Sequence, residues 1–277
     1  MVVFLVIMSS VILAGGTGLS LAASAISLKG NDKQTALLSK MKIPSAPRGF
    51  LGQGDNPGSS PVYGIMWTII YAVNIASSVF LLLAGLSNTI IPESDADACF
   101  NASACMGAAF IATSAWPMTY ELTNSHSASP GRHLTWPLWM SVAIVAVASV
   151  LGLWGLHIYQ PALKGDLAVF LLLSVPWSFF VGWLLIATAV GIAMAYSADI
   201  HGGPREYYDS VEPDTWFGPL LATSVVAIIA GSYGEPFLAL PAVLYTLFIR
   251  LDWKHGLAFG AAVLGVAGGF IRMALKS

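Results

Sequence analysis

Three aromatic residues recur at intervals of four near the start of an apolar stretch, at Tyr63, Trp67 and Tyr71. Pro61 precedes them, and proline suits the first turn of a helix, where backbone N–H groups have no partner within the helix. Residues four apart lie on one face of a helix, so the three rings are expected to form a ladder. Such a ladder can line a flat apolar pocket, or it can belong to the aromatic belt at a membrane interface.

The other chemically capable residues do not form a recognisable catalytic or metal-binding pattern. None of the five histidines is paired with Cys or Glu at ligand spacing on one helix. The chain also lacks a nucleophile elbow, a phosphate-binding loop and a dinucleotide fingerprint. We therefore predict no catalytic residues and no metal site. His157 could ligate the metal of a chlorophyll or haem, although a hydrogen bond to a backbone carbonyl is the commoner role for a histidine near an interface.

Two cysteines and a sequon lie in a stretch that the sequence favours as a short acidic loop. Cys99 and Cys105 are six apart, and Asn101 begins the triplet Asn-Ala-Ser between them. Two cysteines in one exposed loop predict a disulfide if that loop faces an oxidising compartment. Asn101 is then a candidate glycosylation site.

Two polar residues lie in or next to apolar stretches. Asn74 follows Tyr71 by about one helical turn and is expected to bond to a neighbouring helix, with a ligand contact as the alternative. Glu121 is ionisable and close to the membrane, which makes it a functional candidate, although an acid that reaches water from a helix end is the simpler account.

The elements that must position these residues are membrane helices. Of the 277 residues, 56% are hydrophobic and 9% are charged, against about 25% charged in a typical soluble domain. The mean hydropathy is +0.75. This composition indicates an all-α, polytopic transmembrane bundle surrounded by membrane lipid. The net charge of −2 excludes a nucleic-acid-binding protein, which needs a basic face.

We predict eight spans, over residues 2–26, 62–86, 106–122, 138–159, 167–196, 216–233, 236–251 and 256–275. Seven result if the tight pair around Gly234 and Glu235 is a re-entrant hairpin, or if 236–251 does not cross. The first stretch has features of a secretory signal peptide, but no basic residue precedes it and it is long enough to span a bilayer. We expect it to be retained.

Basic residues sort by side in the eight-span arrangement. Those in the connections after spans one, three, five and seven outnumber those on the other side, which are Lys164, Arg272 and Lys276. Because basic residues stay on the cytoplasmic side, both termini and the cysteine loop should face outward or into a lumen. The connection over 44–61, rich in Pro, Gly and Ser, is expected to form a lid over one end of the bundle.

At this point the chain resembles the TspO family of tryptophan-rich sensory and translocator proteins. The second helix of that family opens with Gly-Pro-Val-Trp-Thr-x-x-Tyr, which Gly64-Ile-Met-Trp67-Thr68-Ile-Ile-Tyr71 resembles closely.

The fifth helix of the family carries a proline, then a tryptophan followed four residues later by Ala-Thr. Pro176, Trp183 and Ala187-Thr188 reproduce this order. Gly182 before the tryptophan, with a longer proline spacing, resembles an extended branch that adds helices after the fifth.

The third helix of the family usually has Asn-x-x-Trp. Trp116 matches the tryptophan, whereas Thr113 replaces the asparagine. Any polar contact made by that asparagine is therefore not expected here.

The resemblance covers about residues 11–196. It implies a TspO-like five-helix bundle over 1–196 and an extension over 197–277 with two or three further helices. It also implies a cavity for a porphyrin, chlorophyll-type pigment, sterol or similar flat apolar ligand, a homodimer, and no required cofactor. Trp67 and Trp183 would be the pocket tryptophans, and Tyr63, Tyr71 and Trp116 would shape the walls. Members of the family have been linked to light-dependent porphyrin breakdown, which the sequence does not decide here.

We therefore expect a membrane receptor, sensor or carrier for such a ligand. The alternative is a structural, pigment-bearing subunit of a larger membrane complex. Large apolar faces on the last three helices and pigment ligation by His157 would favour that alternative. A small-solute transporter is disfavoured because charges within the spans are nearly absent.

Overall fold

The computed structural model describes residues 1–29, 61–87, 91–116, 136–159, 167–200, 217–247 and 253–276, and all regular structure in these ranges is helical. The all-α prediction is confirmed. The longer helices are α1 (Val2–Lys29), α3 (Pro61–Ser87), α4 (Glu93–Ser114), α6 (Trp136–Tyr159), α8 (Val175–Ile200), α10 (Phe217–Tyr233), α11 (Pro236–Leu247) and α12 (Trp253–Lys276). A short helix α7 (Leu167–Val169) and a π-helix η3 (Phe170–Ser174) run directly into α8, so these three elements form one long helix.

Five of the described helices are long and apolar enough to cross a membrane. Their apolar segments are Val2–Ser24, Ile65–Ser87, Trp139–Tyr159, Leu167–Ala189 and Leu257–Leu275. Large apolar side chains, among them Leu83, Val150 and Leu264, are exposed on the outer surface. Such an apolar surface is unfavourable in water and is consistent with a membrane protein.

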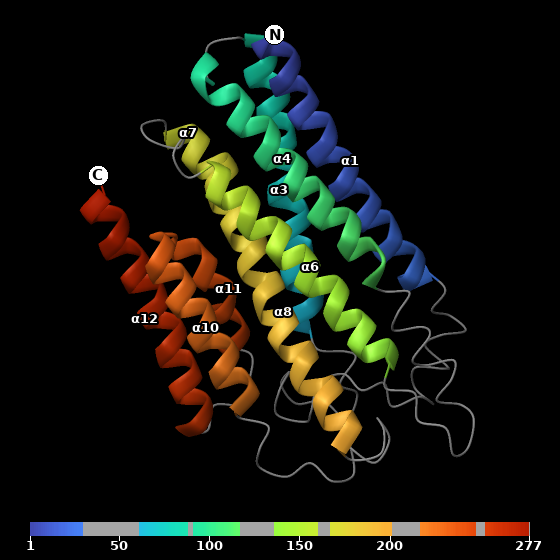
Figure 1. Ribbon diagram of the computed structural model, residues 1–277, viewed down its shortest axis with the longest axis vertical. Coiled ribbons are helices and arrows are strands. Elements are labelled where there is room, and N and C mark those ends of the chain that lie inside the picture. Colours follow the sequence, from blue (N-terminus) through green and yellow to red (C-terminus); the bar gives the residue numbers. More distant parts are fainter. Residues whose placement is uncertain are drawn as a thin grey trace.

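Five helices close into a ring. α1 packs between α3 and α4, α4 packs on α6, α6 on α8, and α8 with η3 returns to α3. Consecutive helices run in opposite directions, and both chain ends lie at the same end of the molecule (Figure 1). The closest approach of α1 and α4 depends on two glycines, since a Cβ on Gly16 would lie 2.6 Å from the carbonyl oxygen of Gly107.

The last three helices form a second group that packs on α8. α10, α11 and α12 contact one another, and α11 and α10 contact α8 (Figure 1). Glycines allow these contacts: a Cβ on Gly182 would overlap the carbonyl oxygen of Leu238 on α11, and one on Gly269 would lie 2.7 Å from the Cα of Pro236. Small residues at such crossings let helix backbones approach closely in a membrane.

The long helix changes its hydrogen-bond pattern just before Pro176. Val175 donates its N–H to the carbonyl oxygen of Phe170, the i→i+5 bond of a π-helix. Proline has no N–H, so the carbonyl of Leu172 loses its usual partner four residues on. The hydroxyl of Ser77 on α3 donates to that carbonyl instead. The carbonyl of Leu172 thus joins the long helix to α3.

The predicted span over 106–122 is wrong at its start, because α4 begins at Glu93. Glu93 and Asp95 lie in its first turn, where acidic side chains interact favourably with the helix dipole. The acidic loop predicted from the sequence is therefore the first half of a helix.

This correction removes the basis for the predicted disulfide. Cys99 and Cys105 are both unbonded, and Cys99 is buried. Six residues along one helix correspond to ~9 Å of rise, beyond the ~7 Å limit between Cα atoms that a disulfide can bridge. Asn101 is exposed but lies within the helix, and the Ser103 of its sequon is buried, so the surface loop assumed for glycosylation is not present there.

Candidate functional site

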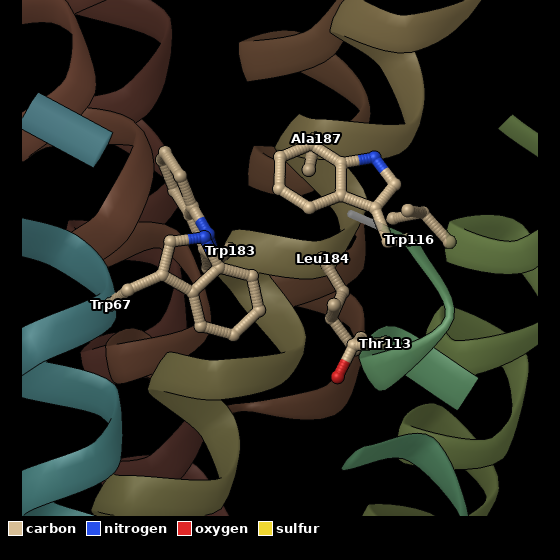
Figure 2. Close-up of a pocket in the computed structure, with 7 residues that line it drawn as sticks. Trp67, Thr113, Trp116, Trp183, Leu184 and Ala187 are labelled. Carbon is tan, nitrogen blue, oxygen red and sulfur yellow. The ribbon is translucent and has the colours of Figure 1, made fainter. Parts of the chain in front are cut away.

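A small apolar cavity lies inside the ring where α3, α4, α6 and α8 meet (Figure 2). Trp67 comes from α3, Trp116 lies just beyond the end of α4, and Trp183 comes from α8. The structure thus brings together three of the residues that the sequence predicted for ligand binding. The complete lining is Trp67, Thr113, Trp116, Val145, Trp183, Leu184 and Ala187.

The α8 contribution follows from helix periodicity. Trp183, Leu184 and Ala187 are spaced at one and four residues, so they share the face that points into the ring. Gly182 lies on the neighbouring face, where α11 approaches. Trp183 is completely buried. α8 thus packs against α11 through Gly182 and faces the cavity through Trp183.

A cluster of aromatic rings adjoins the cavity. The centroid of the Trp67 ring lies 5.4 Å from that of Tyr71, with the rings stacked, and 6.5 Å from both Trp116 and Phe180. Phe180 stacks on Phe110 at 3.9 Å with nearly parallel planes. The stacking of Trp67 on Tyr71 agrees with the predicted ladder.

The sequence prediction did not include Phe110 and Phe180. A usable signal existed, since each lies three residues before a residue that lines the cavity, Thr113 on α4 and Trp183 on α8. Residues three apart share a helix face.

A chain of hydroxyl groups lies behind this aromatic cluster. Thr113 donates to the carbonyl oxygen of Phe110 at 2.8 Å, so its own proton is used. Its oxygen therefore accepts from Ser20 at 3.2 Å, and Ser20 in turn accepts from the Tyr71 hydroxyl at 3.0 Å. Ser24 then donates to Tyr71 at 2.9 Å. These hydroxyls satisfy one another and tie α1, α3 and α4 together.

The cavity is closed in this conformation. Its volume is about 10 Å³, room for about one water molecule, whereas ligand pockets usually measure about 300 to 1,000 Å³. Trp67 and Trp116 are only half-buried, unlike Trp183. A flat ligand of the predicted kind therefore does not fit into the cavity in this conformation.

Two further predicted ligand contacts do not line the cavity. Tyr71 stacks beside it, as described above. Asn74 is fully buried, and its side-chain amide donates to the carbonyl oxygen of Ile70 on its own helix at 2.9 Å. The side-chain amide of Asn74 was predicted to bond to a neighbouring helix. This prediction is wrong, because the amide donates within α3. Tyr63 belongs to α3, but its side chain lies outside the described residues. Glu121 and residues 44–60 of the lid predicted over 44–61 also lie outside them.

His157 does not line this cavity, and the rings that it contacts do not line it either. It is exposed in the last turn of α6, where its ring centroid is 5.7 Å from that of Trp154 and 6.5 Å from that of Tyr233. Within the described ranges, no group of three or more His, Cys, Asp or Glu side chains could hold a metal ion.

The sequence prediction also did not single out one buried acid. Glu235 lies at the turn between α10 and α11, is 6% exposed, and accepts hydrogen bonds from serines of the long helix. From the sequence, Glu235 was predicted only to belong to a tight turn.

Comparison with protein-family models, curated proteins and solved structures gives no match.

Proposed function

We propose that this chain is an integral membrane protein that binds a flat apolar molecule, such as a tetrapyrrole or a sterol, inside its five-helix ring. It would act as a receptor, sensor or carrier. The observation that carries this proposal is the convergence of Trp67, Trp116 and Trp183 from separate helices on one apolar cavity. Indole rings offer large flat surfaces on which a planar ligand can stack.

Binding on this proposal includes an opening step. Trp67 and Trp116 turn away from Trp183, and the ligand takes the space between the rings. The buried hydroxyl chain behind Tyr71 keeps α1, α3 and α4 in register during this movement. The TspO resemblance supports the same residues from the sequence side, through the motifs around Trp67 and Trp183.

The test is a titration of the purified protein with protoporphyrin IX in detergent, followed by the absorbance of the porphyrin. Wild type is compared with Trp67→Phe, Trp183→Phe and the double variant. We expect saturable binding that the double variant weakens at least tenfold, which corresponds to about 1.4 kcal/mol. The porphyrin signal is used because removing indoles alters the protein fluorescence.

Trp154→Phe is the matched control, since this tryptophan is exposed on the outside of the ring. It should bind as wild type does. Equal binding by wild type and the double variant would place the ligand elsewhere. No binding by any of the proteins, with a sterol tested in parallel, would reject the ligand class.

A second function is favoured by one observation, the exposed position of His157 beside Trp154. An outward-facing histidine could ligate the metal of a pigment shared with another chain, as a subunit of a larger membrane complex would need. Pigment that co-purifies with wild type but not with His157→Gln would favour this function over the first.

We also infer six complete crossings rather than eight. The turn between α10 and α11 lies part-way along the long helix, below its upper end (Figure 1), so the pair is better described as a hairpin that enters and leaves on one side, the re-entrant alternative given above. The six crossings are then the five apolar segments together with α4. Removing two crossings from eight keeps both chain ends on one side.

A further inference from the structure

Glu235 is a buried carboxyl group held by another helix. It follows Gly234, whose φ of 75° allows the tight turn between α10 and α11. Its oxygen Oε2 accepts a hydrogen bond from the hydroxyl of Ser178 at 3.0 Å and a longer one from Ser174 at 3.4 Å. Ser174 is the last residue of the π-helix, and Ser178 lies in α8. The π-helical and the α-helical parts of the long helix thus each contribute one serine to the same carboxyl oxygen.

This carboxyl group lies deep within the bundle. Ser174 and Ser178 come seven and eleven residues after Leu167, the start of the apolar segment, which corresponds to ~10 and ~16 Å along a helix. A hydrocarbon core about 30 Å thick that begins at Leu167 would have the second serine near its middle. Figure 1 agrees, because the turn between α10 and α11 lies part-way along the long helix, below its upper end.

The surroundings can stabilise a negative charge at this depth. Glu235 directly precedes α11, so its carboxylate lies near the positive end of the dipole of that helix. The two serines add hydroxyl donors, and hydrogen bonds to an ionised acceptor are the stronger kind. Hairpins that end within the membrane often use such helix ends to bind ions or substrates.

Among the described residues, ionisable groups approach this carboxyl group from α12 and α6. On α12, the side chain of Arg272 passes the turn, with its Cγ 3.4 Å from the position of a Cβ on Gly234. From α6, the exposed His157 contacts Tyr233 at the end of α10. η3 and α8 contribute the two serines, and α11 presents apolar residues, Phe237 and Leu238, in its first turn.

The packing of the hairpin does not itself require an acid at this position. The hairpin is already held by close glycine contacts at Gly182, Gly265 and Gly269. Burying a carboxyl group in a membrane is costly, and a neutral side chain would close the same contact with less cost. Ionisable residues within membrane bundles characteristically bind protons, ions or substrates.

We propose that Glu235 is a reversible proton-binding site at the seam between the long helix and the α10–α11 hairpin. A hydronium ion transfers a proton to a carboxylate oxygen and leaves as water, so one O–H bond breaks and another forms, and the charge of the carboxyl group changes from −1 to zero. The charged form is held by Ser174, Ser178 and the start of α11, and the neutral form interacts more weakly with all three. Since α8 carries Trp183 on its other face, proton binding acts on the helix that supports the cavity.

The test is infrared difference spectroscopy of the full chain in lipid vesicles as the pH is lowered. A protonated carboxyl group has a carbonyl stretch that a carboxylate lacks. The chain has 14 Asp and Glu residues, and each gives such a band once it is protonated. We therefore expect one component of the wild-type band to be lost in Glu235→Gln. Glu93→Gln is the matched control, because Glu93 is exposed in the first turn of α4, and it should keep this component.

Ser178→Ala provides a second readout if Glu235→Gln fails to fold. Removing a hydrogen-bond donor strengthens the C=O bond, so this component should move to higher frequency, while Ser224→Ala on α10 should leave it in place. A band equally strong in Glu235→Gln, a wild-type component that does not respond to pH, or an unmoved component in Ser178→Ala would overturn the proposal. None of these outcomes depends on porphyrin binding.

Discussion

Tyr71 contributes to the site through both of its parts. Its ring stacks on Trp67, and its hydroxyl accepts from Ser24 and donates to Ser20. Since the side chain is 7% exposed, water cannot readily replace these partners. The residue therefore joins the aromatic cluster to the hydroxyl chain behind it.

Tyr71→Phe should destabilise the protein while leaving the stacked ring in place. The change leaves Ser24 without its acceptor and Ser20 without its donor, which we expect to cost about 1 to 2 kcal/mol. Thermal unfolding in detergent, followed by circular dichroism, measures the effect. Tyr196→Phe is the control, since Tyr196 is 61% exposed, and it should unfold with wild type. Equal stability of all three would show that the hydroxyl chain contributes little.

At the scale of the element, the long helix from Leu167 to Ile200 carries different chemistry on its two sides. One side presents Phe180 and Trp183 to the ring, and the other presents serines and Gly182 to the hairpin. The π-helix before Pro176 adds a third contact, the carbonyl of Leu172 that accepts from α3. Among the described helices, this one makes the main contact between the ring and the C-terminal group.

Gly182→Ala should separate α8 from α11. A Cβ at this position would overlap the Leu238 carbonyl, which belongs to a helix backbone and cannot turn aside. We expect a loss of about 1 to 3 kcal/mol of stability, as for other overpacked sites. Gly260→Ala is the matched control, since nothing lies within 4 Å of its added Cβ, and alanine should stabilise that helix by ~0.5–1 kcal/mol. The measurement is the unfolding midpoint of each variant in detergent. Equal shifts of the midpoint in the two variants would contradict this account.

At the scale of the whole molecule, the position of the two chain ends predicts an even number of membrane crossings. α1 starts and α12 finishes at the same end of the bundle (Figure 1). This holds whether α10 and α11 cross fully or form a hairpin. The prediction of both termini on one side therefore does not depend on the exact number of spans.

Epitope tags before Met1 and after Ser277 should be digested from the same side of sealed vesicles. A tag inserted between residues 30 and 60 should be protected under the same conditions, because α1 leads from one end of the bundle to the other. Protease digestion followed by immunoblotting reads all three. Terminal tags on opposite sides would mean an odd number of crossings.

The positions of the helices were largely available from the sequence. Apolar stretches long enough to span a bilayer are a local signal, and Pro61 and Pro236 begin helices where a missing N–H does no harm. The start of α4 was missed for a local reason as well. Its small and acidic residues resemble a loop in composition, although acids in a first turn also favour a helix.

What the sequence by itself determined was a bundle of apolar helices with tryptophans in helical positions, because periodicity and hydrophobicity act within one segment. Only the tertiary structure decided which segments meet. It placed Trp67, Trp116 and Trp183 around one cavity, separated Asn74 from that cavity, and set Glu235 against two serines more than fifty residues away. These contacts depend on backbone approach at glycines and on carbonyls freed near Pro176, which no pattern within a single helix specifies.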